Sequence, residues 1–183
     1  MKIKFYKVSY EQFLNDFKQV YPNGSLYSEE YIKSIYEAIQ LPKRATKGSA
    51  GYDFYSPLSF ELKQKSQALG IWPLFDDEIQ NTITIPTGIR CEMPEDVVLM
   101  IYPRSGNGFK SGTSLANTVG IIDSDYYYSD NEGHIMLKFV EGFKKLSLEQ
   151  GKGLAQGIFI KYLVTEDDEV NEIRNGGFGS TSL

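Results

Sequence analysis

The chain has 183 residues and a formal net charge of −5, with 19 lysines and arginines against 24 aspartates and glutamates. This length suits one domain with a single sizeable core. The acidic balance argues against a general nucleic-acid-binding protein, which would carry a basic surface, although a few well-placed cations can still hold a small anion.

The sequence also indicates a compartment. The single cysteine, Cys91, cannot form a disulfide within the chain, and no spacing of cysteine and histidine suits zinc. The amino terminus lacks the apolar core of a signal peptide, and no apolar run approaches membrane-spanning length. We therefore expect a cytoplasmic protein without a nucleic-acid or membrane partner.

The first 40 residues predict one strand followed by two helices. Residues 2–8 alternate as in a strand. Ser9-Tyr-Glu-Gln12 is typical of a capping box, and apolar residues at helical spacing follow it. A second helix is expected to begin at Ser28 and end before Leu41-Pro42. We expect this helical pair, residues 9–40, to be an insertion that caps the domain, with contact to a protein partner as the alternative.

From residue 41 onward, short apolar runs alternate with turn residues and no helix is expected between them. This pattern predicts an all-β, antiparallel, jelly-roll-like barrel or sandwich, with the whole chain, residues 1–183, as a single domain. Residues 64–80 interrupt the rhythm as an inserted loop. The glycine-rich residues 171–183 are expected to be a flexible tail. The expected strands are residues 52–55, 58–62, 83–85, 89–93, 97–102, 135–140 and 154–164.

Five segments after residue 41 carry candidate chemistry. Arg104, Ser105 and nearby glycine amides can cradle an anion, and Asp123 follows an apolar run that can support it while it holds a water. Each segment also has a structural explanation: an arginine is often a surface ion pair, and Asn117 to Tyr126 can be a hairpin whose Asp and Gly only make the turn. The segments are Ala50-Gly-Tyr-Asp53, Tyr102-Pro-Arg-Ser-Gly106, Asn117 to Tyr126, Leu154-Ala-Gln156 and Arg174-Asn-Gly-Gly-Phe-Gly-Ser-Thr181.

Together, the order and spacing of these segments resemble the five motifs of the homotrimeric dUTP pyrophosphatases (dUTPases), from residue 41 to Thr181. The resemblance implies the fold of that family and hydrolysis of dUTP to dUMP and pyrophosphate with Mg²⁺. It also implies a homotrimer in which each site draws segments from three subunits.

The resemblance assigns the third segment to the nucleoside and the attacking water. Asp123 matches the aspartate that orients the water attacking the α-phosphorus, and a carboxylate can accept a hydrogen bond from that water. Tyr126 matches the tyrosine that packs under the deoxyribose and leaves no room for a 2′-hydroxyl. Asn117 matches the uracil-contacting asparagine, and hairpin backbone groups at Gly120 and Ile122 would complete the recognition of the base.

The first, second and fourth segments match residues that serve the triphosphate. Arg104, Ser105 and Gly106 match the phosphate-contacting Pro-Arg-Ser-Gly segment, and Gln156 matches a phosphate-contacting glutamine. Asp53 matches a carboxylate that helps to place Mg²⁺ through water, while the triphosphate itself holds most of the metal's coordination sphere.

The fifth segment matches the tail that closes over the site. Arg174 matches the arginine that meets the γ-phosphate, and a guanidinium suits phosphate oxygens. Phe178 matches the phenylalanine that stacks on uracil, and Gly179 and Ser180 follow it in the same motif. Closure of such a tail would exclude bulk water.

Four features depart from the family pattern. Gly153 replaces the arginine that usually opens the fourth segment, so that cation is absent or supplied by another residue such as Lys152. The tail is one residue shorter between its arginine and its phenylalanine. Tyr127-Tyr-Ser-Asp-Asn-Glu132 lengthens the loop beside the site, and the helical pair has no counterpart in the usual short enzyme.

Two other readings fit parts of the pattern. A dCTP deaminase shares the fold, but its family carries a catalytic glutamate where this chain has Lys138, which cannot act as a proton-accepting carboxylate. A nucleotide-sensing regulatory protein would use residues 9–40 to bind a partner. His134, the single histidine, lies near the site loop and is expected to be structural.

Overall fold

A computed structural model of the chain describes residues 2–21, 27–64 and 82–170. Most of the expected inserted loop and the whole expected tail, with Arg174, Phe178, Gly179 and Ser180, lie outside the described residues. In chain order the elements are β1 (Lys4–Lys7), α1 (Tyr10–Val20), α2 (Glu29–Ala38), β2 (Lys43–Arg44), β3 (Tyr52–Tyr55), β4 (Phe60–Leu62), β5 (Thr82–Pro86), β6 (Ile89–Glu92), β7 (Val97–Pro103), α3 (Ser105–Ser111), β8 (Ser114–Leu115), β9 (Gly120–Ile122), the 3₁₀ helix η2 (Ser124–Tyr128), β10 (Met136–Val140), β11 (Leu146–Leu148) and β12 (Gly153–Lys161).

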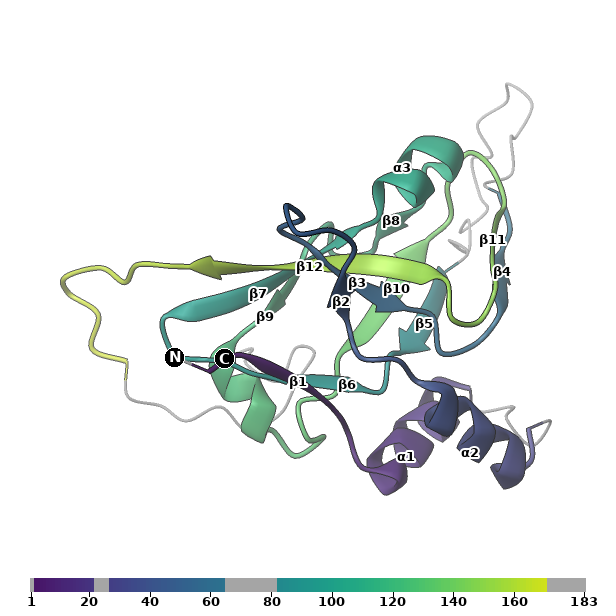
Figure 1. Cartoon of the computed structure of the whole chain (residues 1–183), viewed down its shortest axis with the longest axis horizontal. Helices are drawn as coiled ribbons and strands as arrows, with labels where there is room; N and C mark the ends of the chain where they lie inside the picture. The colour runs from purple at the N-terminus through teal and green to yellow at the C-terminus, as the bar shows by residue number, and fades with distance from the viewer. Residues whose placement is uncertain (1, 22–26, 65–81, 171–183) are drawn as a thin grey trace, which may run out of the picture.

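The strands form antiparallel sheets, as the short apolar runs predicted (Figure 1). The largest sheet has the strand order β2-β3-β12-β7-β9, and a second has the order β5-β10-β8. Two further pairs join β1 to β6 and β4 to β11. Each described strand pair is antiparallel, which confirms the expected all-β, jelly-roll-like class.

The core is built by strands that bury alternate side chains. In β7, Val97, Leu99 and Ile101 are buried while the residues between them are partly exposed. Successive side chains of a strand point to opposite faces, so β7 presents one apolar face to the core. Cys91 of β6 is buried in the same way, and burial raises the pKa of its thiol to about 12.

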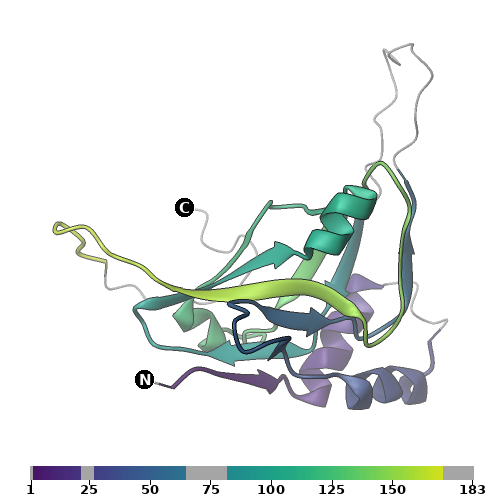
Figure 2. The same cartoon turned by 45° about the horizontal axis from the view of Figure 1, so that its top comes forward.

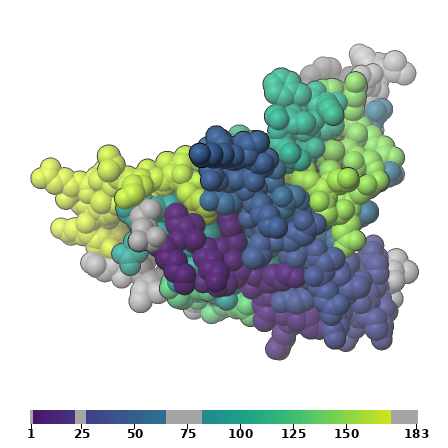
Figure 3. All heavy atoms as spheres, viewed as in Figure 1, coloured from purple at the N-terminus to yellow at the C-terminus, as the bar shows by residue number. Residues whose placement is uncertain are grey.

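The helical pair covers one end of the β domain, away from the carboxyl-terminal end of β12 (Figures 2 and 3). Phe13 and Phe17 of α1 and Ile32 and Ile35 of α2 are buried, as expected from their helical spacing. The hydroxyl of Tyr21, which ends α1, donates to the carbonyl of Thr84 on β5 at 2.8 Å. None of the helices in the described ranges is long and apolar enough to span a membrane.

The amino terminus of α1 differs in one detail from the expected capping box. Ser9 Oγ accepts a hydrogen bond from Gln12 N at 3.1 Å, as predicted. The Gln12 side chain does not return to the Ser9 amide but donates to Asp16 at 2.9 Å. The Ser9 amide donates instead to Glu132 Oε2 at 2.8 Å, so a distant loop completes the cap.

Two helical elements lie between strands where the sequence predicted none. α3 begins directly after Arg104, and η2 begins directly after Asp123. Asn107 of α3 donates from Nδ2 to the carbonyl of Leu154 on β12 at 3.1 Å, and α3 ends at Gly112, whose φ is 72°. Tertiary contact and a left-handed terminal glycine therefore hold a helix of low intrinsic propensity.

The segment from Asn117 to Tyr126 is not the predicted hairpin. β8 pairs with β10, whereas β9 pairs with β7, so the two strands flanking the turn belong to different sheets. The turn itself is tight, because Thr118 N donates to Leu115 O at 3.0 Å and Thr118 adopts a φ of 64°. The segment therefore joins the two sheets rather than making a local ladder.

Candidate active site

A cavity of about 520 Å³ opens between the ends of β8, β9, β10 and η2. Four residues that the sequence assigned to the nucleoside line it: Asn117, Gly120, Ile122 and Tyr126. Sequence reasoning did not assign the remaining lining residues, which are Thr84, Leu115, Ala116, Val119, Ile121, Met136, Leu137 and Lys138. Most of these walls are apolar, as expected for a pocket that receives a flat ring.

Tyr126 is held firmly in the wall of this cavity. Its side chain is 5 % exposed, and its hydroxyl donates to the carbonyl of His134 at 2.8 Å. The same hydroxyl accepts from Asn131 Nδ2 at 2.8 Å. Because both bonds fix the far end of the ring, the ring cannot tilt without breaking a buried hydrogen bond.

Gly120 brings the backbone of β9 close to β7. A Cβ at this position would lie 3.3 Å from Ile101 Cβ, a tight contact that would require Ile101 to shift by a few tenths of an ångström. Gly120 pairs with Ile101, and both residues are buried. The backbone of this wall is therefore fixed by sheet pairing, which suits recognition of a base by amide and carbonyl groups.

Asp123 is next in sequence to Ile122, which lines the cavity. It precedes η2, and its carbonyl accepts from Tyr126 N at 3.3 Å. Its side chain is partly buried. The strand β9 and the turn of η2 thus hold the carboxylate three residues from the tyrosine in the cavity wall, which fixes the spacing between them.

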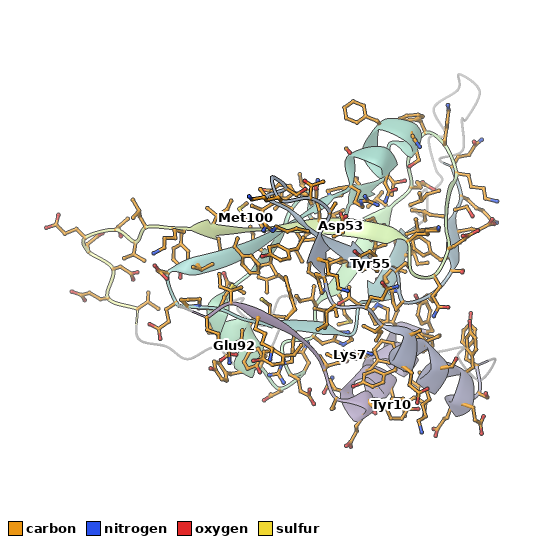
Figure 4. All side chains as sticks on the ribbon, viewed as in Figure 1. Lys7, Tyr10, Asp53, Tyr55, Glu92 and Met100 are labelled. Carbon is orange, nitrogen blue, oxygen red and sulfur yellow. The ribbon has the colours of Figure 1, made fainter. Side chains whose placement is uncertain are left out.

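A second group of assigned residues gathers where β3, β12 and β7 meet α3. Asp53 of β3, labelled in Figure 4, pairs in register with Gln156 of β12. Arg104 Nε lies 3.2 Å from Asp53 Oδ1 in an ion pair whose side chains are 42 % and 17 % exposed. Gln156 Nε2 donates to Pro103 O at 3.4 Å. Ser105 and Gly106 follow in the first turn of α3.

Gly153 makes room for Arg104. A Cβ at position 153 would overlap the guanidinium, since it would lie 2.6 Å from Arg104 Cζ and 2.9 Å from Cδ. The position that usually carries an arginine is therefore left open for the side chain of Arg104. Arg104, rather than Lys152, is the cation that lies over position 153.

The carboxylates of the described residues do not form a protein cage for a metal. In the described ranges no group of three or more His, Cys, Asp or Glu side chains is arranged to hold a metal ion. A single carboxylate, that of Asp53, stands beside the cation of Arg104. This donor set suits a metal ion that arrives with its own anionic ligands and meets the protein through water.

The fold and these two groups define an all-β protein with a mostly apolar pocket and a nearby guanidinium–carboxylate pair. Both groups adjoin β7: β9 pairs with its middle residues, and Arg104 follows its last residue. A cavity of this kind suits a ring, and a guanidinium suits phosphate or carboxylate oxygens. The class that they indicate is a protein that binds a small molecule with a ring and anionic groups.

Comparison with known proteins identifies the family. The family model for dUTPase matches residues 75–182. The deoxyuridine 5′-triphosphate nucleotidohydrolase of Lactococcus lactis is 39 % identical over 148 residues, which cover 78 % of this chain and 88 % of that protein. The enzyme of the same name from Dictyoglomus turgidum is 36 % identical over 158 residues, 83 % and 97 % of the two chains.

A solved structure agrees with this result. The crystal structure of dUTPase from Streptococcus mutans is similar to this chain with a TM-score of 0.56 and 32 % identity, over 71 % of this chain and 91 % of that one. The chain belongs to the dUTPase family. The resemblance inferred from the five segments is thereby confirmed.

Proposed function

We propose that the protein hydrolyses dUTP to dUMP and pyrophosphate. The observation that carries this proposal is the cavity in which Asn117, Gly120 and Tyr126 meet, with Asp123 between the lining residues Ile122 and Tyr126 in the sequence. The names of the relatives from Lactococcus lactis and Dictyoglomus turgidum describe the same activity.

The cavity suits uracil and deoxyribose. Asn117 and the backbone beside Gly120 and Ile122 supply polar groups for one edge of the base, while the apolar walls accept its faces. The ring of Tyr126 takes the sugar and excludes a 2′-hydroxyl because bonds to His134 and Asn131 prevent it from moving aside. These contacts favour deoxyuridine over uridine.

The group at β3, β12 and α3 suits the triphosphate. Arg104 is partly exposed and its ion pair with Asp53 is a single contact, so its guanidinium can turn to phosphate oxygens. Ser105, Gly106 and Gln156 add donors nearby. Asp53 would then hold Mg²⁺ through water, and the metal, carried by the triphosphate, would neutralise charge on the phosphates.

Asp123 orients the attacking water. Its carboxylate accepts a hydrogen bond from the water and takes the proton as the water oxygen bonds to the α-phosphorus. The bond from the α-phosphorus to the bridging oxygen breaks at the same centre, and pyrophosphate leaves with the electron pair. The products are dUMP and pyrophosphate.

We further propose that three copies of the chain complete each site. The support is that the two groups lie on different elements of one chain, while Leu163, Val164 and Val170 beyond β12 expose apolar side chains that a second copy can cover. Arg174, Phe178, Gly179 and Ser180, outside the described residues, would close over the γ-phosphate and the base. The enzyme would act in the cytoplasm.

The test is a product assay on the purified full chain with dUTP, dCTP, dTTP and UTP in the presence of Mg²⁺. We expect dUMP and pyrophosphate from dUTP alone. Ammonia from dCTP would indicate a deaminase instead, although Lys138 stands in the cavity wall where that activity needs a carboxylate. Tight dUTP binding without product would indicate a sensor.

A further inference from the structure

A buried hydrogen bond between a histidine and a carboxylate joins the helical pair to the loop that follows the site. His134 Nδ1 and Asp16 Oδ2 of α1 lie 2.5 Å apart, and these residues are 0 % and 5 % exposed. Asp16 also accepts from Gln12 Nε2 at 2.9 Å. The two partners are 118 residues apart in the sequence, so the contact exists only because α1 packs against this loop.

The surroundings of His134 fix its tautomer. Gly88 N donates to His134 Nε2 at 2.8 Å, so Nε2 is an acceptor and carries no proton. The ring proton is therefore on Nδ1, which donates to the carboxylate of Asp16. A carboxylate that accepts from Nδ1 and a backbone amide that donates to Nε2 together set the orientation of the imidazole.

The main chain of His134 is hydrogen-bonded to Tyr126, which lines the cavity proposed for the nucleoside. Its carbonyl accepts the hydroxyl of Tyr126, and its amide donates to the carbonyl of Asn131 at 3.1 Å. Asn131 in turn donates from Nδ2 to the same hydroxyl. The position of His134 thus sets the position of the Tyr126 hydroxyl, at one end of the ring that lines the cavity.

A second tether joins the same two regions. Glu132 Oε2 accepts from Ser9 N at 2.8 Å and Glu132 Oε1 accepts from Ser9 Oγ at 2.6 Å, at the amino terminus of α1. Arg90 lies 3.5 Å from Glu132 and donates to the carbonyl of Tyr127 at 2.5 Å. Residues 127–134 and the inserted helical pair therefore contact each other through Ser9–Glu132 and Asp16–His134, and the ring centroids of Phe13 and His134 lie 6.0 Å apart.

We infer that α1 acts as a buttress for Tyr126, and that Asp16 and Glu132 are positioning residues for the rejection of a 2′-hydroxyl. This inference rests on the proposed function, since it concerns the choice between dUTP and UTP. A ring held at its hydroxyl excludes one extra oxygen only while it cannot shift, and freedom of the ring to move weakens that exclusion. The helical insertion thereby determines specificity without touching the nucleotide.

The test compares kcat/KM for dUTP with kcat/KM for UTP in the full chain and its variants. Asp16→Asn and Glu132→Gln keep the size of each side chain but remove its charge. We expect the ratio to fall by roughly tenfold, chiefly because UTP turnover rises. Tyr126→Phe removes the hydroxyl at the end of the chain of bonds, so the double variant with Asp16→Asn should lose no more than the larger single effect.

The matched control is a pair of helix caps. Ser9 and Ser28 each accept a bond from a helix amide, at 3.1 Å and 3.2 Å, but only Ser9 also bonds Glu132. Ser9→Ala should lower the ratio and Ser28→Ala should leave it unchanged, although both remove a cap. Melting temperatures measured on the same variants show whether a change in the dUTP-to-UTP ratio can be explained by a loss of stability alone.

The outcomes are distinct. Asp16→Asn, Glu132→Gln and Ser9→Ala that melt earlier but keep the wild-type ratio would overturn the buttress and leave the proposed function intact. A wild-type chain that does not hydrolyse dUTP would overturn both. If Asp16→Asn does not fold, Glu132→Gln and Ser9→Ala decide the matter, because their contacts are more exposed.

Discussion

The cavity proposed for the nucleoside and the group proposed for the phosphates are built in opposite ways. The cavity has walls fixed by sheet pairing and by a tyrosine with a buried, doubly bonded hydroxyl. The other group holds Arg104 by one partly exposed ion pair to Asp53 over an open glycine. Under the proposed function, the base and sugar meet walls fixed by the fold, whereas the triphosphate meets a guanidinium held by one partly exposed ion pair.

Asp123→Asn removes the carboxylate proposed to orient the attacking water between the two regions, and it should have the largest effect on turnover. The amide has nearly the same size but cannot take a proton, so kcat should fall roughly a thousandfold while the affinity for dUTP stays within a few-fold. Pyrophosphate release and equilibrium binding check these two quantities. Normal turnover would mean that Asp123 does not orient the water.

Removal of residues 174–183 tests whether closure of the tail over both regions contributes to catalysis. Because closure excludes bulk water, kcat should fall about a hundredfold, and the melting temperature should stay unchanged. The same assays apply, with circular dichroism for the fold. A fully active truncated chain would remove Arg174 and Phe178 from the mechanism.

Gly153→Ala tests the proposed phosphate-binding group alone. The new Cβ would overlap the guanidinium of Arg104 and displace it from the place proposed for phosphate contact, so kcat/KM for dUTP should fall about 10- to 100-fold, the value of a charge-assisted hydrogen bond. The ratio of dUTP to UTP turnover should not change, because the cavity is untouched.

Gly108→Ala is the matched control for that variant. A Cβ at Gly108 in α3 meets nothing within 4 Å, so turnover should stay at the wild-type level. An equal loss in both variants would show that Arg104 is not sensitive to the space over position 153.

The smallest expected effect is the pH dependence of the tether at Glu132. Burial raises the pKa of this carboxyl, but the bonds from Ser9 and the charge of Arg90 outweigh burial and hold the pKa below its usual 4.5. A lowered pKa stabilises the folded state above pH 4.5, and this contribution disappears as the pH falls through the folded-state value.

Denaturant unfolding of the wild type and of Glu132→Gln at several pH values checks this. The wild type should be more stable by about 1 kcal/mol at pH 7, and the difference should shrink below pH 4.5. A difference that stays constant down to pH 3 would mean that the charge of Glu132 contributes nothing.

The sequence predicted strands such as β6 and β7 because they bury alternate side chains, a property visible in a short window, but it did not predict the short strands β8 and β11. It failed for α3, whose Ser-Gly-Asn-Gly stretch has low helix propensity and depends on the bond from Asn107 to Leu154. It also failed for the hairpin at Asn117, because the partner strands of β8 and β9 are chosen by distant residues.

The candidate site shows the same limit. Asn117 and Tyr126 were found from their place in a motif, and the cavity brings them together. Thr84 and Met136 enter the cavity wall through the pairing of β5 with β10, which no local pattern reveals. The bond from Ser9 to Glu132 joins residues 123 positions apart, so only coordinates reveal it.

The burial of Cys91 has a practical consequence for spectroscopy. At neutral pH a thiol with a pKa of about 12 is almost entirely protonated, and its position in the core keeps maleimide and iodoacetamide reagents away. In the native protein Cys91 should therefore not react with thiol-specific labels. A cysteine introduced on the exposed face of α2 would carry a single fluorophore, and movements of the helical pair could be followed during turnover without removing the natural thiol.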